Sequence, residues 1–575
     1  MIQKALTKGQ CKMKKLLMMF ACALITAGMI AATVDFPTRA GDIAIEGTGG
    51  WTTMPTSGDL ARFRFSNGTY TASDDVEFGS IYVSESAVFN LHTSGNKTVK
   101  LSAFAVAVDN MTAILNGGMW DISGTTPGTG NNVVGTFGPC NRYSTKGTKL
   151  ILANGCIATN ITYLVVSNGG EGNLLKISDN SKVYTKNVYF ENNYVNYETP
   201  ACNGLLEVVD GSELLVSERF YVGANASSRA NIARFDTGSK FNLCGVKIGR
   251  NGASMNTLEI CGNSTGKFVG AAYIGSESGA SQGNRLILSN ATLECSIVYV
   301  SPTAESSSNA FYIAGSDTSF TATVTNVARY PFVYRGSHNT FEMDGVTWNY
   351  WNTMQLDDAA SSNTIRFVNG ARLNVNNNGI ASGTNHVASC GNRVYVGSES
   401  ELHLDFLHIS RSDNVVTVSN ATISATRTTD SWSGIRFGTI LTNVDQSNIG
   451  GNGLVIQGNS PSVSAVREIK FQNGSFLRLE MPEGTYAEGC VPVSARAFSI
   501  SEDSALEIDC AFGRMSPGKY TLISTTNGIT IPASVLEAAN ASLVEQGNSA
   551  ARLALSNGGK MLLLKVSRGT VLSFR

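Results

Sequence analysis

The sequence is poor in charge. Asp, Glu, Lys and Arg together make up 15% of the 575 residues, against about a quarter in typical soluble proteins. The Lys and Arg residues are not clustered, as they would be in a protein that contacts the phosphates of DNA or RNA. We therefore expect no nucleic-acid partner.

Metal-ligand motifs are also missing. The 11 cysteines contain no C-x-x-C pair, and the five histidines do not join Cys or acidic residues at ligand spacing. The calcium-binding phrase Gly-Gly-x-Gly-x-Asp is incomplete, because the stretch Gly450-Gly-Asn-Gly-Leu-Val has no Asp. We expect no metal and no other cofactor.

The cysteines are scattered. Those at strand positions, Cys244, Cys261 and Cys295, are expected to be small buried apolar residues rather than disulfides. Nine cysteines follow residue 40, so at least one stays free even if the others pair. If a disulfide forms, Cys490 and Cys510 are the pair that we expect.

The N-terminus has the features of a secretory signal peptide. A basic segment at residues 12–15 precedes an apolar run over residues 16–32, and Thr38-Arg39-Ala40 offers a small-x-small cleavage site. The run is short for a transmembrane helix, and we expect no membrane span after cleavage. Cleavage removes six of the 43 basic residues and one of the 44 acidic ones, which leaves residues 41–575 with a net charge of −6. The sequence thus predicts an exported protein.

Two short phrases recur along the chain, and their spacing predicts the fold. The phrase Phe220-Tyr-Val-Gly223 returns in three later copies that close at Gly249, Gly275 and Ser301, a constant step of 26 residues. A second phrase begins with Asn and leads the first by a nearly constant distance. Ten steps take this second phrase from residue 173 to residue 448. Its average step is therefore only slightly longer than the 26-residue step of the first phrase. A fixed period of this size is typical of a repeat architecture.

Apolar residues alternate within the Asn phrase, as Leu258 and Ile260 or Phe341 and Met343 illustrate. A period of two indicates strands with one buried face. The repeat is too short for a propeller blade, and the strands are too short for a membrane barrel. We therefore predict an all-β fold, a single-stranded right-handed parallel β-helix (solenoid) with about 22–34 residues per coil and terminal caps.

Four segments follow from this pattern. Residues 1–40 are the signal peptide, 41–147 the N-terminal cap and first irregular coils, 148–484 the regular β-helix, and 485–575 the C-terminal cap, with one helix expected from Pro532 to Ala541. The recurring Asn is expected to form a ladder whose side-chain amides bond to the coils above and below. Its predicted members are Asn203, Asn231, Asn256, Asn284, Asn309, Asn339, Asn363, Asn392 and Asn414.

With these phrases, and with the closing Gly518-Lys-Tyr-Thr-Leu-Ile, the chain resembles the secreted bacterial β-helix repeat proteins, in particular autotransporter passengers and adhesins. The resemblance covers about residues 60–575. It implies an exported protein that acts at or beyond the cell surface. The C-terminal residues lack the alternating ten-residue strands of a translocator barrel, so the resemblance does not imply self-translocation.

A catalytic site has few candidates. Glycoside hydrolysis needs two carboxylates that face one bond, and Asp357-Asp358 is the most conspicuous acidic pair in the regular coils. Adjacent strand residues point to opposite faces, so a solvated turn is the simpler interpretation. His338 is expected in a turn, and His408 at an outward strand position.

Aromatic residues gather at Trp348, Tyr350 and Trp351. Exposed rings of this kind stack on sugars, whereas buried ones fill a core. We thus expect first a non-catalytic exported solenoid, either structural or adhesin-like. A glycan-binding module and a carbohydrate-active hydrolase or lyase are the alternatives. Polysaccharides and cell-surface components are the expected partners, and the sequence does not indicate the oligomeric state.

Overall fold

The computed structural model of the chain divides into two compact units, Met1–Asn187 and Val188–Arg575. It describes residues 33–36, 42–44, 55–56, 59–63, 68–83, 88–106, 108–124, 136–139, 145–167, 170–190, 201–322, 332–351, 354–356, 360–376, 380–382, 390–397, 399–428, 433–438, 450–481, 486–487, 489–510 and 516–567.

The first unit contains two sets of parallel strands. One sheet holds β2 (Asp42–Ala44), β4 (Gly68–Ala72), β7 (Val88–Thr93), β10 (Thr112–Asn116), β13 (Lys149–Ala153) and β15 (Leu174–Ile177). The other holds β1 (Thr33–Phe36), β3 (Leu60–Phe63), β5 (Val76–Glu77), β6 (Ser80–Val83), β8 (Thr98–Lys100), β9 (Ala103–Val106), β11 (Met119–Asp121), β12 (Thr136–Gly138), β14 (Ile157–Val165) and β16 (Lys182–Tyr189).

In the second unit each coil contributes three strand positions. The first is held by β17 (Leu205–Val208), β19 (Ile232–Phe235), β22 (Thr257–Ile260), β25 (Arg285–Ser289), β28 (Ala310–Ala314), β31 (Thr340–Asp344), β34 (Thr364–Val368), β37 (Arg393–Gly397), β40 (Val415–Ser419), β43 (Gly453–Gln457), β45 (Phe476–Met481) and β47 (Ala505–Cys510). The second is held by β20 (Lys240–Cys244), β23 (Thr265–Val269), β26 (Thr292–Cys295), β29 (Ser319–Ala322), β32 (Thr347–Trp351), β35 (Arg372–Asn376), β38 (Glu401–Leu404) and β41 (Thr422–Ala425).

The third position is held by β21 (Val246–Ile248), β24 (Ala271–Ile274), β27 (Ile297–Val300), β30 (Phe332–Tyr334), β33 (Met354–Leu356), β36 (Ile380–Ser382), β39 (Phe406–Ile409) and β42 (Gly434–Phe437). Long strands cover the second and third positions together in four coils: β18 (Glu213–Val222), β44 (Ser462–Phe471), β46 (Val493–Ile500) and β48 (Gly518–Thr530). A short 3-10 turn, η1, spans Arg250–Gly252.

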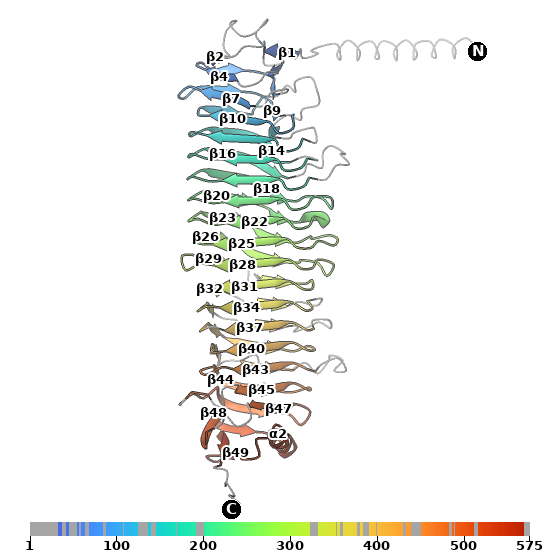
Figure 1. The fold of residues 1–575 in the computed structure, drawn as a ribbon, viewed down its shortest axis with the longest axis vertical. Coiled ribbons are helices and arrows are strands. Elements are labelled where there is room, and N and C mark those ends of the chain that lie inside the picture. The colour runs from blue at the N-terminus through green and yellow to red at the C-terminus, as the bar shows by residue number, and fades with distance from the viewer. Residues whose placement is uncertain are drawn as a thin grey trace, which may run out of the picture. The chain divides into compact units, whose positions relative to one another are not determined.

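Strands pair in parallel with the equivalent strand of the next coil. In the second unit β19 pairs with β22, and β22 with β25, without a shift in register. Successive coils within each unit lie one above the next (Figure 1). The predicted parallel β-solenoid is thereby confirmed, with roughly 27 residues per turn. Its right-handedness stays a prediction.

The alternating residues of the Asn phrase form the core, as predicted. Leu258, Ile260, Phe341 and Met343 are each fully buried. Because the register is constant, side chains of one kind stack in columns through the interior. For example, Phe311 pairs with Phe341 in register, and their ring centroids are 5.6 Å apart. Each buried ring removes a large apolar area from water.

The recurring asparagines stack in a continuous buried ladder in the second unit. In the typical step, the Oδ1 of one Asn accepts the backbone N–H and the Nδ2–H of the Asn one coil before it. The backbone bonds are 2.8–3.2 Å long and the side-chain bonds 2.9–3.2 Å. The members are at most 2% exposed: Asn231, Asn256, Asn284, Asn309, Asn339, Asn363, Asn392, Asn414 and Asn452.

Two positions differ from the predicted ladder. Asn203 is exposed and has a left-handed backbone (φ 55), and Gly204 takes the ladder position, where its N–H donates to Asn231 Oδ1 at 2.9 Å. The prediction for Asn203 was therefore wrong by one residue. The residue before a ladder position often has a left-handed backbone conformation. Asn tolerates that conformation and also suits the ladder position itself. The stack continues beyond the predicted members to Asn452, whose Oδ1 accepts from Asn414. Residue 448, where the last predicted phrase begins, lies outside the described residues.

The two recurring phrases are physically coupled. A Cβ on Gly249 would lie 2.3 Å from the side-chain amide of Asn284, so the close approach of the ladder Asn requires Gly at the end of the Tyr-Val-Gly phrase. Gly249 also has a left-handed backbone (φ 87). At Ser301 the hydroxyl joins the ladder instead: it accepts from Asn309 Nδ2 at 2.7 Å and donates to Asn339 Oδ1 at 2.6 Å. This coupling explains why both phrases recur together.

The C-terminal residues end the solenoid in a different way. Parallel pairing continues through β46 and β48, and α2 (Ala533–Glu545) follows, close to the predicted helix. The strands β49 (Ala551–Ser556) and β50 (Met561–Val566) form an antiparallel hairpin, and β50 pairs with β48. The helix packs on β47, the last strand of its column (Figure 1). This hairpin and helix cover strand edges that would otherwise be open.

At the N-terminal end, β1 lies within the predicted signal peptide and pairs with β3. Cleavage after Ala40 would remove it, and that cleavage stays a prediction. Among the described residues, none of the helices has the length and apolar character needed to cross a membrane.

Removal of one ladder amide should destabilise the fold. Asn309→Ala removes the Oδ1 that accepts from the backbone N–H and Nδ2 of Asn284. We expect the free energy of unfolding to fall by about 2–4 kcal/mol, because two buried donors lose their acceptor. Asn374→Ala is the matched control, since its Nδ2 donates to Asn349 Oδ1 on the outer surface, and it should cost less than about 0.5 kcal/mol. Urea unfolding followed by circular dichroism measures both, and equal losses would contradict a special role of the ladder.

Candidate functional site

An outward row of side chains follows the third strand position in the second unit. Register pairs Tyr221 with Lys247, Lys247 with Tyr273, and Tyr273 with Tyr299. We call these four residues the tyrosine row. Tyr221 is buried to 6% exposure, whereas the other three are half-buried. These residues belong to the recurring Tyr-Val-Gly phrase, so the repeat itself creates the row.

The rings of the tyrosine row contact one another and a cation. Tyr273 and Tyr299 stack with their centroids 4.9 Å apart and their planes 10° apart. Lys247 Nζ lies 5.4 Å from the centroid of Tyr273 and 5.7 Å from that of Tyr221, within cation–π range. Arg250 lies 5.0 Å from the Tyr221 centroid. The two faces of the Tyr273 ring are thus occupied by Lys247 and Tyr299 of the neighbouring coils, and one face of Tyr299 is occupied by Tyr273.

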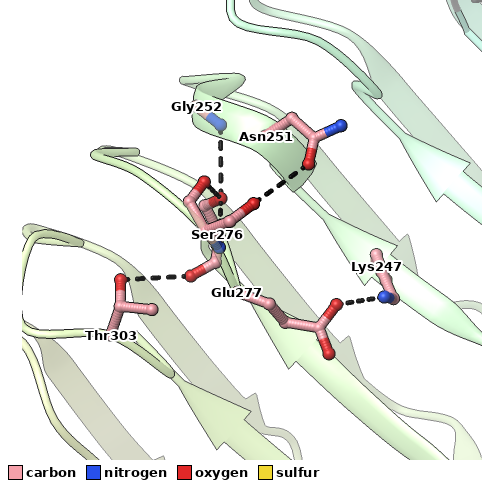
Figure 2. A network of polar contacts seen from close by, with 7 residues as sticks. Lys247, Asn251, Gly252, Ser276, Glu277 and Thr303 are labelled. Atoms are coloured by element: carbon pink, nitrogen blue, oxygen red, sulfur yellow. Dashed lines mark hydrogen bonds and ion pairs between the residues drawn. The ribbon is translucent and has the colours of Figure 1, made fainter.

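The turns beside the row are joined by hydrogen bonds across three coils, as Figure 2 shows. The Ser276 hydroxyl accepts from Gly252 N–H at 3.3 Å, and the Ser276 carbonyl accepts from the Thr303 hydroxyl at 3.3 Å. Lys247 forms an ion pair with Glu277 of the next turn. The charge of Lys247 is therefore already neutralised within the protein. This arrangement binds coil to coil and uses the polar groups of these turns for contacts within the protein.

A second polar cluster lies near the end of the solenoid and was not predicted from the sequence. Glu480 and Asp509 are register neighbours on β45 and β47, about 4.8 Å apart along the stack. Arg478 donates to Glu507 at 2.6 Å and lies 3.8 Å from Glu480. We call these four residues the Arg478 cluster. Glu480 and Asp509 are a full coil apart in sequence, which explains why no local motif signalled them.

Burial raises the pKa of Glu480, and nearby Asp509 adds to this effect, whereas Arg478 opposes it. A carboxyl with a raised pKa beside a second carboxylate is the arrangement that glycosidases use for proton donation. Arg478 is hydrogen-bonded within the cluster, and its pKa is raised chiefly by the bond to Glu507. The cluster combines one acid whose pKa is raised by burial with an arginine-bound carboxylate.

A cavity of about 520 Å³ lies between the segment that contains Tyr486 and Cys490 and the start of β48. The Tyr486 hydroxyl donates to Ile456 O at 3.1 Å, and burial raises the pKa of Tyr486. Cys490 and Cys510 are both free thiols, so the pair named for the case that a disulfide forms is not bonded. Each sits in its own packed environment, with the Cys490 thiol 3.4 Å from Pro461 O.

The predicted binding residues are not brought together as expected. Trp348 is fully buried and packs on Phe320, with ring centroids 4.8 Å apart, so its predicted contact with a glycan is wrong. Its strand position points inward, and the ring fills the buried column. The side chains of Tyr350 and Trp351, and all of Asp357 and Asp358, lie outside the described residues.

The histidines divide between the two expectations. His338 has a left-handed backbone (φ 57) immediately before a ladder Asn, which agrees with a turn position. Register places His408 in the same outward strand column as Tyr299, as expected. The side chain is nevertheless covered, since it is 3% exposed and packs 4.9 Å from the Phe406 ring. Among the described residues no group of three or more His, Cys, Asp or Glu side chains is arranged to hold a metal ion.

Thiol reactivity should follow burial. Cys390 is exposed, whereas Cys156 is buried and its pKa is raised by burial. Because the thiolate is the reactive form, a maleimide at pH 8 should label Cys390 within minutes and Cys156 only after unfolding. Peptide mapping by mass spectrometry measures both, and should recover Cys490 and Cys510 as alkylated thiols. Recovery of these two as a disulfide would contradict the described geometry.

Comparison of the chain with protein-family models, with curated proteins and with solved structures finds no match.

Proposed function

We propose that this protein is an exported, non-catalytic β-solenoid that serves as a structural or adhesin-like component on a bacterial surface or outside the cell. The observation that carries the proposal is that outward side chains in the tyrosine row and around Arg234 are used for contacts between coils. Arg234 is the clearest case, since it lies 2.7 Å from Glu259 in the next coil and 3.6 Å from Glu207 in the previous one. The tyrosine row repeats this pattern with aromatic rings.

These contacts between coils favour a structural role over a catalytic one. An active site leaves a base, an acid or a nucleophile free to meet its substrate. In the tyrosine row and at Arg234, charges and rings are instead paired along the stack. Together with the buried ladder, these pairs make neighbouring coils interdependent, which suits a protein that must stay folded outside the cell.

Export of the protein can be tested with a reporter. Residues 1–45 fused to a β-lactamase without its own signal should confer ampicillin resistance, and the fusion should be shortened by cleavage. Leu24→Arg in the apolar run should abolish both effects, because a charge in the centre of that run costs about 3 kcal/mol on membrane insertion. A fusion that remains uncleaved and cytoplasmic would contradict the export proposal.

A carbohydrate-active enzyme is the second candidate, and one specific observation favours it. Glu480 and Asp509 fulfil the requirement of two carboxylates from neighbouring coils at one strand position. Because burial raises the pKa of Glu480, this carboxyl is the suitable proton donor. The nearby Arg478 argues against this role, since its cation lowers the pKa of Glu480 and so opposes the effect of burial.

A polysaccharide panel separates these functions. The exported protein is incubated with plant, algal and host polysaccharides, and new reducing ends are measured over a day. We expect none above a no-protein control. Release that is abolished by Glu480→Gln but kept in Glu213→Gln, an acid on another strand, would replace the structural proposal with an enzymatic one. Retention of a glycan without release, lost in Tyr299→Ala or Trp351→Ala, would instead indicate a glycan-binding module.

A further inference from the structure

One edge of β47 faces the C-terminal helix, and only some of the backbone N–H and C=O groups on that edge have hydrogen-bond partners. Ala505 N–H donates to Ser475 O at 2.9 Å, on the side of the preceding coil. Since backbone groups alternate along a strand, those of Leu506, Ile508 and Cys510 point the opposite way, toward α2. No further parallel strand of this column follows among the described residues, so other groups must satisfy that edge.

Side-chain amides after α2 satisfy the second half of the edge. Gln546 Nε2 donates to Ile508 O at 2.7 Å, and Gln546 Oε1 accepts from Cys510 N–H at 3.3 Å. Asn548 Nδ2 donates to Cys510 O at 3.3 Å. These two side chains thus replace the backbone of a missing strand.

The first half of the edge faces a cavity instead. The N–H and C=O of Leu506 and the N–H of Ile508 have no hydrogen-bond partner among the described residues. The cavity has a volume of about 310 Å³ and lies between β47 and α2. We call it the cap groove. A groove that contains unused strand donors and acceptors offers the hydrogen bonds of a next strand.

The walls of the cap groove fit an extended chain. Ser534, Ala538 and Ser542 are spaced by four residues, so these small side chains lie along one side of the helix. Leu506 and Val535 supply an apolar lining. At the rim Glu502 forms no ion pair with any described residue, and this leaves a negative charge for a basic side chain. Small walls permit close backbone approach, and the unpaired carboxylate favours a cationic partner.

We propose that the cap groove binds an extended, lysine- or arginine-bearing peptide segment of a partner protein, which adds to β47 as a short further strand. The peptide backbone would bond to the N–H and C=O of Leu506, which lines the groove, and its cation would face Glu502. Strand addition at an exposed sheet edge is a general mode of peptide recognition. The inference is independent of the proposed function, because it depends only on the edge of β47.

The test uses the full exported protein and a synthetic peptide, acetyl-Thr-Val-Lys-Val-Thr-amide, with binding measured by saturation-transfer NMR on the peptide. We expect saturable binding that becomes at least tenfold weaker when the peptide is N-methylated on alternate amides, because methylation removes strand donors. Replacement of its Lys by Glu should weaken binding by a similar factor, as should Glu502→Gln in the protein.

Ala538→Trp should fill the cap groove and abolish binding, and Ala541→Trp is the matched control. Both alanines are exposed on the same helix, but only Ala538 lines the cavity. Thermal unfolding should be similar for the two variants. Absence of saturable binding, equal binding of the N-methylated peptide, or equal loss in both variants would each overturn the proposal.

Discussion

The buried asparagine ladder is the interaction on which the second unit depends. A parallel solenoid must turn its backbone at every coil, and buried backbone groups at these turns need partners. One amide side chain per coil meets this need, since its Oδ1 accepts from both the backbone and the side chain of the preceding Asn. The stack ends at Asn452, whose Nδ2 has no hydrogen-bond partner among the described residues, because Ser475 stands in the next coil. The ladder thus holds neighbouring coils in register. That register decides which side chains of neighbouring coils contact one another.

Constant register also shapes the outer surface. A residue type that recurs in the repeat becomes a row, and in a row each side chain meets its equivalent one coil away. Opposite charges then pair, as Arg234 does with two glutamates, and rings stack, as Tyr273 does on Tyr299. The same rule places Glu480 beside Asp509. A row whose side chains contact one another holds neighbouring coils together, whereas the register at β45 and β47 places two carboxylates side by side.

At the end of a solenoid the last strand has no further strand to pair with, so its outer backbone groups need other partners. Helix α2 and the amides of Gln546 and Asn548 satisfy one half of the β47 edge, whereas Leu506 faces an open groove. An open strand edge is either an aggregation risk or a binding site. The open portion is short, which limits the risk of aggregation. Its enclosure by the helix favours a binding site.

The sequence by itself determined the repeat, the strand alternation, most ladder positions and the helix before the final hairpin, because each of these follows from local spacing. The sequence pattern placed Asn203 in the ladder by mistake, because Asn is favourable both at a left-handed turn position and at a ladder position. Only the tertiary structure decided which outward residues meet. Trp348 became a core residue through the strand face on which it falls, and Glu480 acquired a carboxylate neighbour from the next coil. Such contacts depend on how many residues each turn inserts between coils, and no local pattern specifies that number.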